Sequence, residues 1–206
     1  MDGSTDRAPG HEVPAPLAER LRRHTTRDVK EAADLATILA FVARHRQPFD
    51  RRIVEGHLTG SALVLSGGGD HVLLLFHRKL ARWLQPGGHA EPGEEDGATV
   101  ALREAREETG LSEVALHSRA PRPLDVDVHD IPARGSEPAH QHLDLRYLVV
   151  ASPAAALRRA HAEARDLRWF GWSDLPGLDL DPGLRRALGT ARGYFPLTSN
   201  DHGDDR

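Results

Sequence analysis

Three glutamates in the middle of the chain have a spacing that suits a metal site. Glu104, Glu107 and Glu108 fall within the segment Gly97–Thr109, whose alanines and leucine recur at helical intervals. Positions i, i+3 and i+4 lie on one face of an α-helix, so the three carboxylates are expected to lie close together. Like charges so placed repel one another, and a hard divalent cation that prefers oxygen ligands, Mg²⁺ or Mn²⁺, relieves the repulsion. The spacing therefore indicates a divalent-cation site on this helix.

The same residues are also compatible with an ordinary solvated helix, on which Arg103 and Arg106 pair with the glutamates. Short motifs of this kind often match by chance, and the motif alone favours the solvated helix. The preceding loop, residues 87–96, changes the balance. It begins with Gly87 and Gly88, and glycine, which has no Cβ, lets the backbone approach a ligand closely. A glycine-rich loop that leads into a helix rich in carboxylates favours the metal site.

Taken together, the loop and the helix resemble the Nudix box, the signature of the Nudix hydrolase family. The signature is Gly, five residues, Glu, seven residues, and then Arg-Glu-apolar-any-Glu-Glu-any-Gly-apolar. Gly88 and Glu94 match its first part, and residues 103–111 match its second part. Eight residues rather than seven separate Glu94 from Arg103, whereas Glu95 has the right distance to Arg103 but lies one residue too far from Gly88. The first glutamate position is therefore open to either Glu94 or Glu95.

The resemblance extends over roughly residues 57–190 and implies an α/β/α sandwich around a mixed sheet. It implies a Mg²⁺-dependent hydrolase, with Mn²⁺ as an alternative ion, that cleaves the diphosphate linkage of a nucleoside diphosphate joined to another moiety. The metal ligands that it implies are Gly88, through its carbonyl, Glu104, Glu107 and Glu108. The catalytic residues that it implies are Arg103, which orients a glutamate of the box, Glu104, Glu107 and Glu94. Metal ions make such a reaction feasible because they neutralise the diphosphate and acidify a bound water.

Two further roles are not fixed by the box. In many members of the resembled family the catalytic base lies elsewhere, and the candidates here are Glu94, Glu95, Glu137 and Glu163. A nucleobase could stack on an aromatic side chain, although packing in the core is the simpler interpretation for each one. The aromatic candidates are Trp83, Tyr147, Trp169 and Trp172.

One expected strand carries polar side chains at every second position. His140, His142, Asp144 and Arg146 are predicted to share a face, which is either a wall of the substrate site or a solvent-exposed surface. As a wall, it would bring His142 and Arg146 to the phosphates. His89 is a further substrate-binding candidate, because its loop leads into the metal helix. A Zn²⁺ site formed by His129, His140 and His142 is a weaker alternative.

Short strands and few helices must position these groups. We expect a hairpin from residues 61–65 and 71–76, and further strands at 114–118, 124–129, 142–151 and 168–172. Helices are expected at 26–45, with Asp28 and Glu31 as a capping box, at 97–109, ended by Gly110, and at 182–191 after Asp181. This pattern lacks regular βαβ alternation and predicts an α+β fold.

The order of these elements also predicts the domain organisation. Residues 1–50 are expected to be a disordered start, over 1–14, followed by a helical arm. Residues 51–195 are expected to form the catalytic domain, and residues 196–206 a flexible tail.

Composition excludes several classes of protein. The 206 residues include no cysteine, which rules out disulfides, thiolate nucleophiles and Cys-ligated zinc. The net charge of −4 argues against binding to a nucleic acid polymer. The start of the chain does not resemble a signal peptide, and no apolar run approaches the length of a membrane span. We therefore expect a cytoplasmic protein without a membrane partner, which acts on a small diphosphate and is compatible with a homodimer.

Two other functions compete with hydrolysis. A non-catalytic ligand-sensing module on the same fold would be expected to lose glutamates of the box and to gain a DNA-binding segment, and neither feature is present. An isomerase on this fold would depend on a cysteine, which the chain lacks. The identity of the diphosphate is open, because selectivity resides in loops outside the box.

Overall fold

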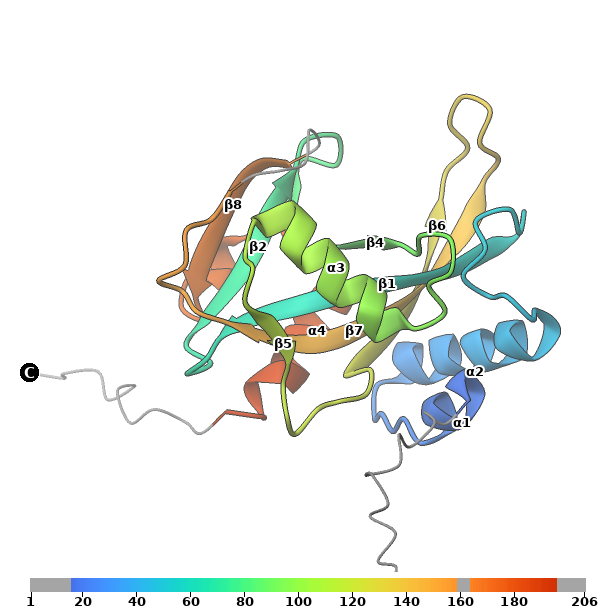
Figure 1. Cartoon of the computed structure of the whole chain (residues 1–206), viewed down its shortest axis with the longest axis horizontal. Coiled ribbons are helices and arrows are strands. Elements are labelled where there is room, and N and C mark those ends of the chain that lie inside the picture. The colour runs from blue at the N-terminus through green and yellow to red at the C-terminus, as the bar shows by residue number, and fades with distance from the viewer. Residues whose placement is uncertain (1–15, 159–163, 196–206) are drawn as a thin grey trace, which may run out of the picture.

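A mixed β-sheet with helices on both of its faces forms the protein (Figure 1). The computed structural model describes residues 16–158 and 164–195. The sheet has the order β3-β2-β1-β7-β5, and β4 pairs with β1, β6 with β7 and β8 with β2. The strands are β1 (Gly56–Ser66), β2 (His71–His77), β3 (Arg82–Leu84), β4 (Gly87–His89), β5 (Val114–Leu116), β6 (Asp125–Ile131), β7 (His140–Ala151) and β8 (Ala164–Gly171). The helices are α1 (Leu17–Arg22), α2 (Val29–Arg44), α3 (Gly97–Thr109) and α4 (Pro182–Arg192), with a 3₁₀ turn at Leu175–Gly177.

The two longest strands form the centre of the sheet. β1 and β7 run parallel, in a register that extends from Gly56 opposite Gln141 to Ser66 opposite Ala151. The other strand pairs are antiparallel, including β1 with β2, so the predicted hairpin is confirmed. β4 is short and lies against the middle of β1, where it brings the glycine loop to the sheet.

The two faces of the sheet pack against different helices. One face packs against α3 and the N-terminal helices, and the other packs against α4, so that in Figure 1 α3 lies in front of the sheet and α4 behind it. Residues at alternate positions of β1 pack into the two layers, because side chains of a strand point alternately to opposite faces. The first layer includes Leu58, Ala62, Val64, Leu145, Tyr147, Val100, Ala101 and Ala105. The second includes Leu63, Leu65, Leu148, Leu184, Ala187 and Leu188. The expected α+β sandwich around a mixed sheet is confirmed.

The predicted helix ends follow from local chemistry. The Asp28 side chain accepts a hydrogen bond from the Glu31 backbone N–H at 2.9 Å and so begins α2. Asp181 caps α4 in the same way through the Leu184 N–H, and Pro182 occupies the first helical position. Gly110 has φ of 73°, a left-handed conformation that suits glycine, and it ends α3 where expected.

Some elements were not predicted, because they are too short to show periodicity. These are α1, β3 and β4, the last two with three residues each. β1 begins five residues earlier than the predicted strand, because His57 and Thr59 are buried polar residues that interrupt the apolar pattern. The segments expected to be disordered, residues 1–14 and the tail from 196, lie outside the described residues. Within those residues, no helix is long and apolar enough to cross a membrane.

Candidate functional site

The glutamates of α3 lie against the two glycines of β4. The Gly87 backbone N–H donates a hydrogen bond to Oε2 of Glu108 at 3.0 Å. A Cβ at Gly88 would lie 2.4 Å from Oε1 of Glu104, so a side chain at this position would displace the glutamate. The fold therefore brings carboxylates of one helix face and the backbone of the glycine loop into contact.

Arg103 connects the parts of this site. Its guanidinium donates to Oε2 of Glu94 at 3.0 Å, to Oε1 of Glu104 at 3.0 Å and to Oε2 of Glu107 at 2.9 Å. It also donates to the His89 carbonyl at 2.6 Å. These hydrogen bonds from Arg103 hold the pKa of Glu94 below its ordinary value. One partly buried cation thus contacts three carboxylates and the loop that precedes the helix.

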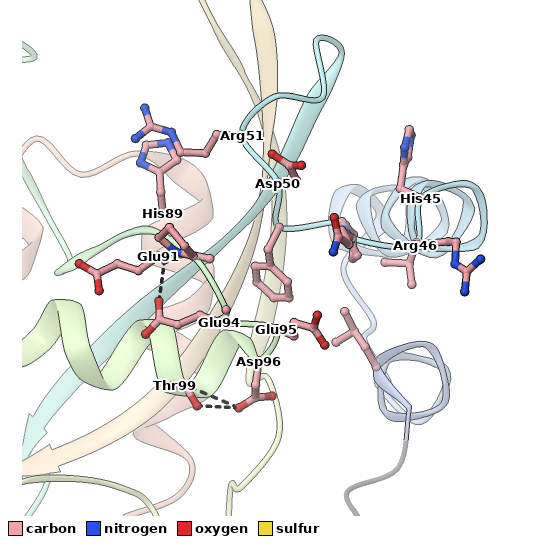
Figure 2. Close-up of a pocket in the computed structure, with 18 of the residues that line it drawn as sticks. His45, Arg46, Asp50, Arg51, His89, Glu91, Glu94, Glu95, Asp96 and Thr99 are labelled. Carbon is pink, nitrogen blue, oxygen red and sulfur yellow. Dashed lines mark hydrogen bonds between the residues drawn. The ribbon is translucent and has the colours of Figure 1, made fainter.

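The extra residue in the loop separates the roles of Glu94 and Glu95. Glu94 turns back toward α3 and contacts Arg103, while Glu95 is exposed and points toward the N-terminal helices (Figure 2). Glu94 also accepts a hydrogen bond from the Glu91 backbone N–H at 2.9 Å, which closes the loop. The structure therefore brings Glu94, rather than Glu95, to the position beside Arg103.

Four histidines gather on the side of the sheet opposite Gly88. They are His57 on β1, His89 on β4, and His140 and His142 on β7. The ring centroids of the last three lie 5.0 to 5.1 Å from that of His57. The Nε2 atoms of His89 and His142 are 3.1 Å apart. Burial lowers the pKa of His57 to about 4, that of His89 to about 3 and that of His142 to about 2. These three imidazoles are therefore neutral at neutral pH.

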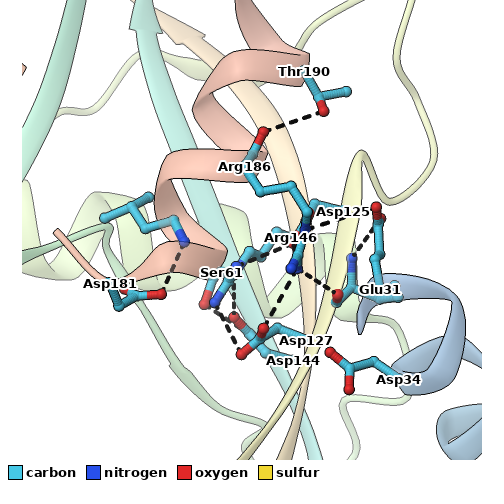
Figure 3. Close-up of polar contacts among 12 residues, drawn as sticks. Glu31, Asp34, Ser61, Asp125, Asp127, Asp144, Arg146, Asp181, Arg186 and Thr190 are labelled. Atoms are coloured by element: carbon cyan, nitrogen blue, oxygen red, sulfur yellow. Dashed lines mark hydrogen bonds and ion pairs between the residues drawn. The ribbon is translucent and has the colours of Figure 1, made fainter. Parts of the chain in front are cut away.

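Arg146 lies apart from these groups, in a buried cluster of ion pairs (Figure 3). Its guanidinium contacts Asp125 at 3.1 Å, Asp127 at 3.3 Å and Asp144 at 3.2 Å, and only 2% of the residue is exposed. α4 covers it, since a Cβ at Gly183 would lie 2.9 Å from Nη1 of Arg146. The polar face of β7 was expected to be either a substrate wall or a solvent-exposed surface, and at Arg146 it is neither. The side chain is enclosed by its three carboxylate partners and by α4.

The remaining candidates occupy varied places. Glu137 lies in the β6–β7 hairpin, which projects away from α3 (Figure 1), and Glu163 is outside the described residues. The aromatic candidates pack within the protein. Tyr147 is 2% exposed, Trp83 stacks edge-on against Phe170, and the Trp172 Nε1–H donates to the Gly69 carbonyl at 2.7 Å. Trp169 lies partly buried against the core.

A groove opens beside the glycine loop, with a volume of about 1620 Å³ (Figure 2). One wall consists of the loop and α3, including His89, Glu94, Arg103 and Glu104. The opposite wall is formed by the N-terminal arm and by residues 45–52, which connect it to β1. The site is therefore shared between the expected catalytic domain and the expected arm.

The wall contributed by the arm carries positive charge. Four arginines line it, namely Arg20, Arg46, Arg51 and Arg52. Arg20 pairs with Asp96 at 2.7 Å and Arg52 with Asp50 at 2.7 Å, whereas the pair of Arg51 with Glu137 is longer, at 3.8 Å. Sequence reasoning missed this wall. The signal that could have shown it is the run of basic residues between the arm helix and the first long strand.

Comparison with known proteins agrees with this geometry. The family model described as "NUDIX domain" matches residues 56–189. A probable DHNTP pyrophosphohydrolase of Lactococcus lactis subsp. cremoris is 33% identical over 115 residues, which are 55% of this chain and 61% of that protein. The chain therefore aligns with about three fifths of the length of this curated relative.

Two solved structures are similar in fold. A NUDIX family hydrolase from Clostridium perfringens shares 24% identity with a TM-score of 0.55, over 67% of this chain and 97% of that one. A MutT NUDIX hydrolase from Burkholderia pseudomallei shares 26% identity with a TM-score of 0.50, over 66% of this chain and 98% of that one. Both alignments leave about a third of this chain without a counterpart.

Proposed function

This chain belongs to the Nudix family, and from that premise we propose that it is a metal-dependent hydrolase of a diphosphate linkage in a small anionic substrate. The observation that carries the proposal is the contact of Glu104 and Glu108 with Gly87 and Gly88, at the edge of a groove lined by Arg103. A purely structural role would not explain why one helix face concentrates carboxylates against bare backbone.

The donor set of the site fits Mg²⁺ or Mn²⁺. Carboxylate oxygens of Glu104, Glu107 and Glu108 and the carbonyl of Gly88 are hard oxygen ligands, which both ions prefer. Like charges of this helix face are compensated within the site by Arg103, which contacts two of the three carboxylates. A bound divalent cation would neutralise charge on the diphosphate and acidify a water molecule for attack.

Residues of the chain itself position the carboxylates and bind the substrate. Arg103 fixes Glu94, Glu104 and the His89 carbonyl, so the loop and the helix keep one relative geometry. Arg103 therefore contributes to catalysis as a positioning residue. On the opposite wall, Arg46 and Arg51 offer guanidinium groups to the anionic oxygens of a substrate in the groove. His89 lines the same groove and is the histidine that we assign to substrate binding.

The relative from Lactococcus suggests one substrate class beyond nucleoside diphosphates joined to another moiety. Its name denotes a pyrophosphohydrolase of dihydroneopterin triphosphate, so a pterin triphosphate is an additional candidate. Nucleotide and pterin triphosphates share a planar heterocycle and a phosphate chain, and the volume of the groove, about 1620 Å³, accommodates either.

The experiment is a panel of diphosphate and triphosphate compounds, with release of phosphate or pyrophosphate as the readout. We expect hydrolysis of at least one compound with Mg²⁺ or Mn²⁺ and none after addition of EDTA. Glu104→Gln should abolish turnover, while Glu113→Gln, which changes an exposed glutamate after the helix, should not. Full turnover in metal-free buffer would contradict the mechanism. Tight binding of a panel compound without turnover would instead favour the ligand-sensing alternative.

A further inference from the structure

The rings of the histidine cluster lie on the face of the sheet opposite the glutamates of α3. Gly88 and His89 are consecutive on β4, so their side-chain directions point to opposite faces of the sheet. The Gly88 side meets Glu104 of α3, whereas His89 lies against His57 and His142. Glu104 therefore lies on one side of β4 and the histidine rings lie on the other.

From this arrangement we infer that His57, His140 and His142 form a second metal site, which binds a divalent transition-metal ion of the zinc class. One nitrogen from each residue can be chosen so that all three lie within 4.8 Å of one another. Imidazole nitrogen is a preferred ligand of Zn²⁺, at Zn–N distances of about 2.0–2.1 Å. Three histidines leave one position of a tetrahedral ion open, which a water molecule or an anionic oxygen would fill.

The buried nitrogen atoms of His57 are the strongest evidence for a ligand. Only 2% of this residue is exposed, and neither ring nitrogen has a hydrogen-bond partner among the residues that the structure describes. Buried polar atoms are nearly always hydrogen-bonded, and an orphaned one costs about 1–3 kcal/mol. The ring of His57 contacts those of three other histidines, and one of its nitrogens lies within 4.8 Å of a nitrogen of His140 and of His142.

His140 is already oriented as a metal ligand. Its Nδ1 lies 2.9 Å from the Pro138 carbonyl, which accepts only from a protonated nitrogen, so Nδ1 carries the proton and Nε2 keeps a lone pair. That Nε2 is buried and has no hydrogen-bond partner among the described residues, the Oε1 atom of Glu137 being 4.0 Å away. A backbone carbonyl that fixes the tautomer in this way is the usual second partner of a histidine bound to a metal.

The ligand set differs in one residue from the zinc site that the sequence offered as a weaker alternative. The weaker alternative in the sequence analysis combined His129 with His140 and His142, on their loose spacing alone. In the structure, the ring of His129 contacts that of His142, with centroids 5.5 Å apart, but its Nδ1 atom lies 3.2 Å from Asp127 and its side chain is 44% exposed. His57, which comes from the parallel strand β1 and lies directly opposite His142, takes its place.

The test uses the full chain, stripped of metal by a chelator and returned to buffer with excess Mg²⁺. The excess Mg²⁺ supplies the carboxylates of α3 with the class of ion that they prefer. Zn²⁺ is then titrated against a chromophoric chelator, and Co²⁺ is added to a parallel sample, because its visible absorption distinguishes tetrahedral nitrogen ligation from octahedral oxygen ligation. Neither readout needs a substrate, so a failure of the proposed hydrolase activity would not affect the result.

We expect the wild-type chain to bind one Zn²⁺ and to give the intense Co²⁺ absorption of a tetrahedral site. His57→Gln and His140→Gln should each weaken Zn²⁺ binding by at least about 100-fold, the upper scale for changes to the support of a metal ligand. His129→Gln is the matched control and should bind as the wild type does. Circular dichroism checks that each variant is folded, and if His57→Gln unfolds, His140→Gln and the wild-type Co²⁺ spectrum still decide.

Three results would overturn the inference. The first is a wild-type chain that takes up no Zn²⁺ in excess Mg²⁺. The second is a folded His140→Gln chain that binds Zn²⁺ as tightly as the wild type. The third is a loss of binding in His129→Gln as large as that in His140→Gln, which would place the ion among a different set of histidines.

Discussion

The carboxylate of Glu104 occupies the space that a side chain at position 88 would fill, and this contact defines the geometry of the carboxylate site. A Cβ at position 88 would lie 2.4 Å from Oε1 and 2.6 Å from the carboxyl carbon of Glu104. Gly88→Ala should therefore leave the fold intact, because the end of a flexible side chain can rotate away, but it should lower turnover by about 10²-fold through misplacement of that carboxylate. Thermal unfolding and steady-state kinetics check both parts. Gly67→Ala, which adds a methyl group in open space in a turn, is the matched control.

Substitutions of Glu107 and Glu108 show whether these glutamates bind the metal or only stabilise the fold. Glu107→Gln and Glu108→Gln keep the size of the side chain and remove one charge, so each should lower turnover in excess Mg²⁺ by at least about 10²-fold. In EDTA the melting temperature should stay equal or rise, because repulsion along the helix face is relieved. The half-exposed ion pair of Glu107 with Arg103 offsets this gain by less than about 1 kcal/mol. Wild-type turnover combined with lower stability would show that these glutamates are structural.

At the residue scale, the sequence identifies what is local and misses what depends on long-range pairing. The spacing of Arg103 and the glutamates is a property of one helix and one loop, so it can be read directly. Two of the three carboxylates around Arg146 come from β6, and α4 covers it, so its burial was not predictable from alternation on β7. His57 joins the histidine cluster only because β1 and β7 run parallel. That pairing has no signature within either strand.

The close approach of α3 to β1 depends on Gly60. A Cβ there would lie 2.5 Å from the Gly97 carbonyl oxygen and 3.0 Å from the Ala101 backbone nitrogen, and backbone atoms cannot rotate away. Gly60→Ala should therefore destabilise the protein by about 1–3 kcal/mol, the cost of overpacking, as measured by chemical denaturation. Gly189→Ala, within α4 and facing open space, should have the opposite effect and stabilise by about 0.5–1 kcal/mol. Equal stabilities of the wild type and Gly60→Ala would contradict this packing.

At the element scale, capped and periodic segments were predictable and short ones were not. α2, α3 and α4 have a side-chain cap at their first turn, and these local signals fixed where each helix begins. β4 has three residues and is held by its pairing with β1 and by hydrogen bonds to Glu108 and Arg103 of α3, so no pattern within the strand reveals it. Yet β4 delivers both Gly88 to the glutamates and His89 to the histidines. The strand that was hardest to predict thus contributes to both the carboxylate site and the histidine cluster.

Across the whole molecule, the N-terminal arm belongs to the core as well as to the groove. Leu21, Ile38 and Phe41 are buried in the same cluster as the sheet. Charged contacts add to this packing, since Arg186 of α4 lies 2.7 Å from Asp125 of β6 and 3.8 Å from Glu31 of α2 (Figure 3). Because the connection from the arm to β1 also lines the groove, the arm fixes a wall opposite the carboxylates.

Two substitutions separate these two roles of the arm and its connection. Phe41→Ala removes a buried ring and should lower the free energy of unfolding by about 3–5 kcal/mol. Arg51→Gln, which changes an exposed side chain on the groove wall, should change it by less than about 0.5 kcal/mol. It should instead raise KM several-fold with little change in kcat, because a charge on the wall binds substrate and transition state alike. Arg22→Gln, on an exposed part of α1 outside the groove, is the control for lost charge. If Arg51→Gln and Arg22→Gln give the wild-type KM, the arm contributes packing and Arg51 does not contact the substrate.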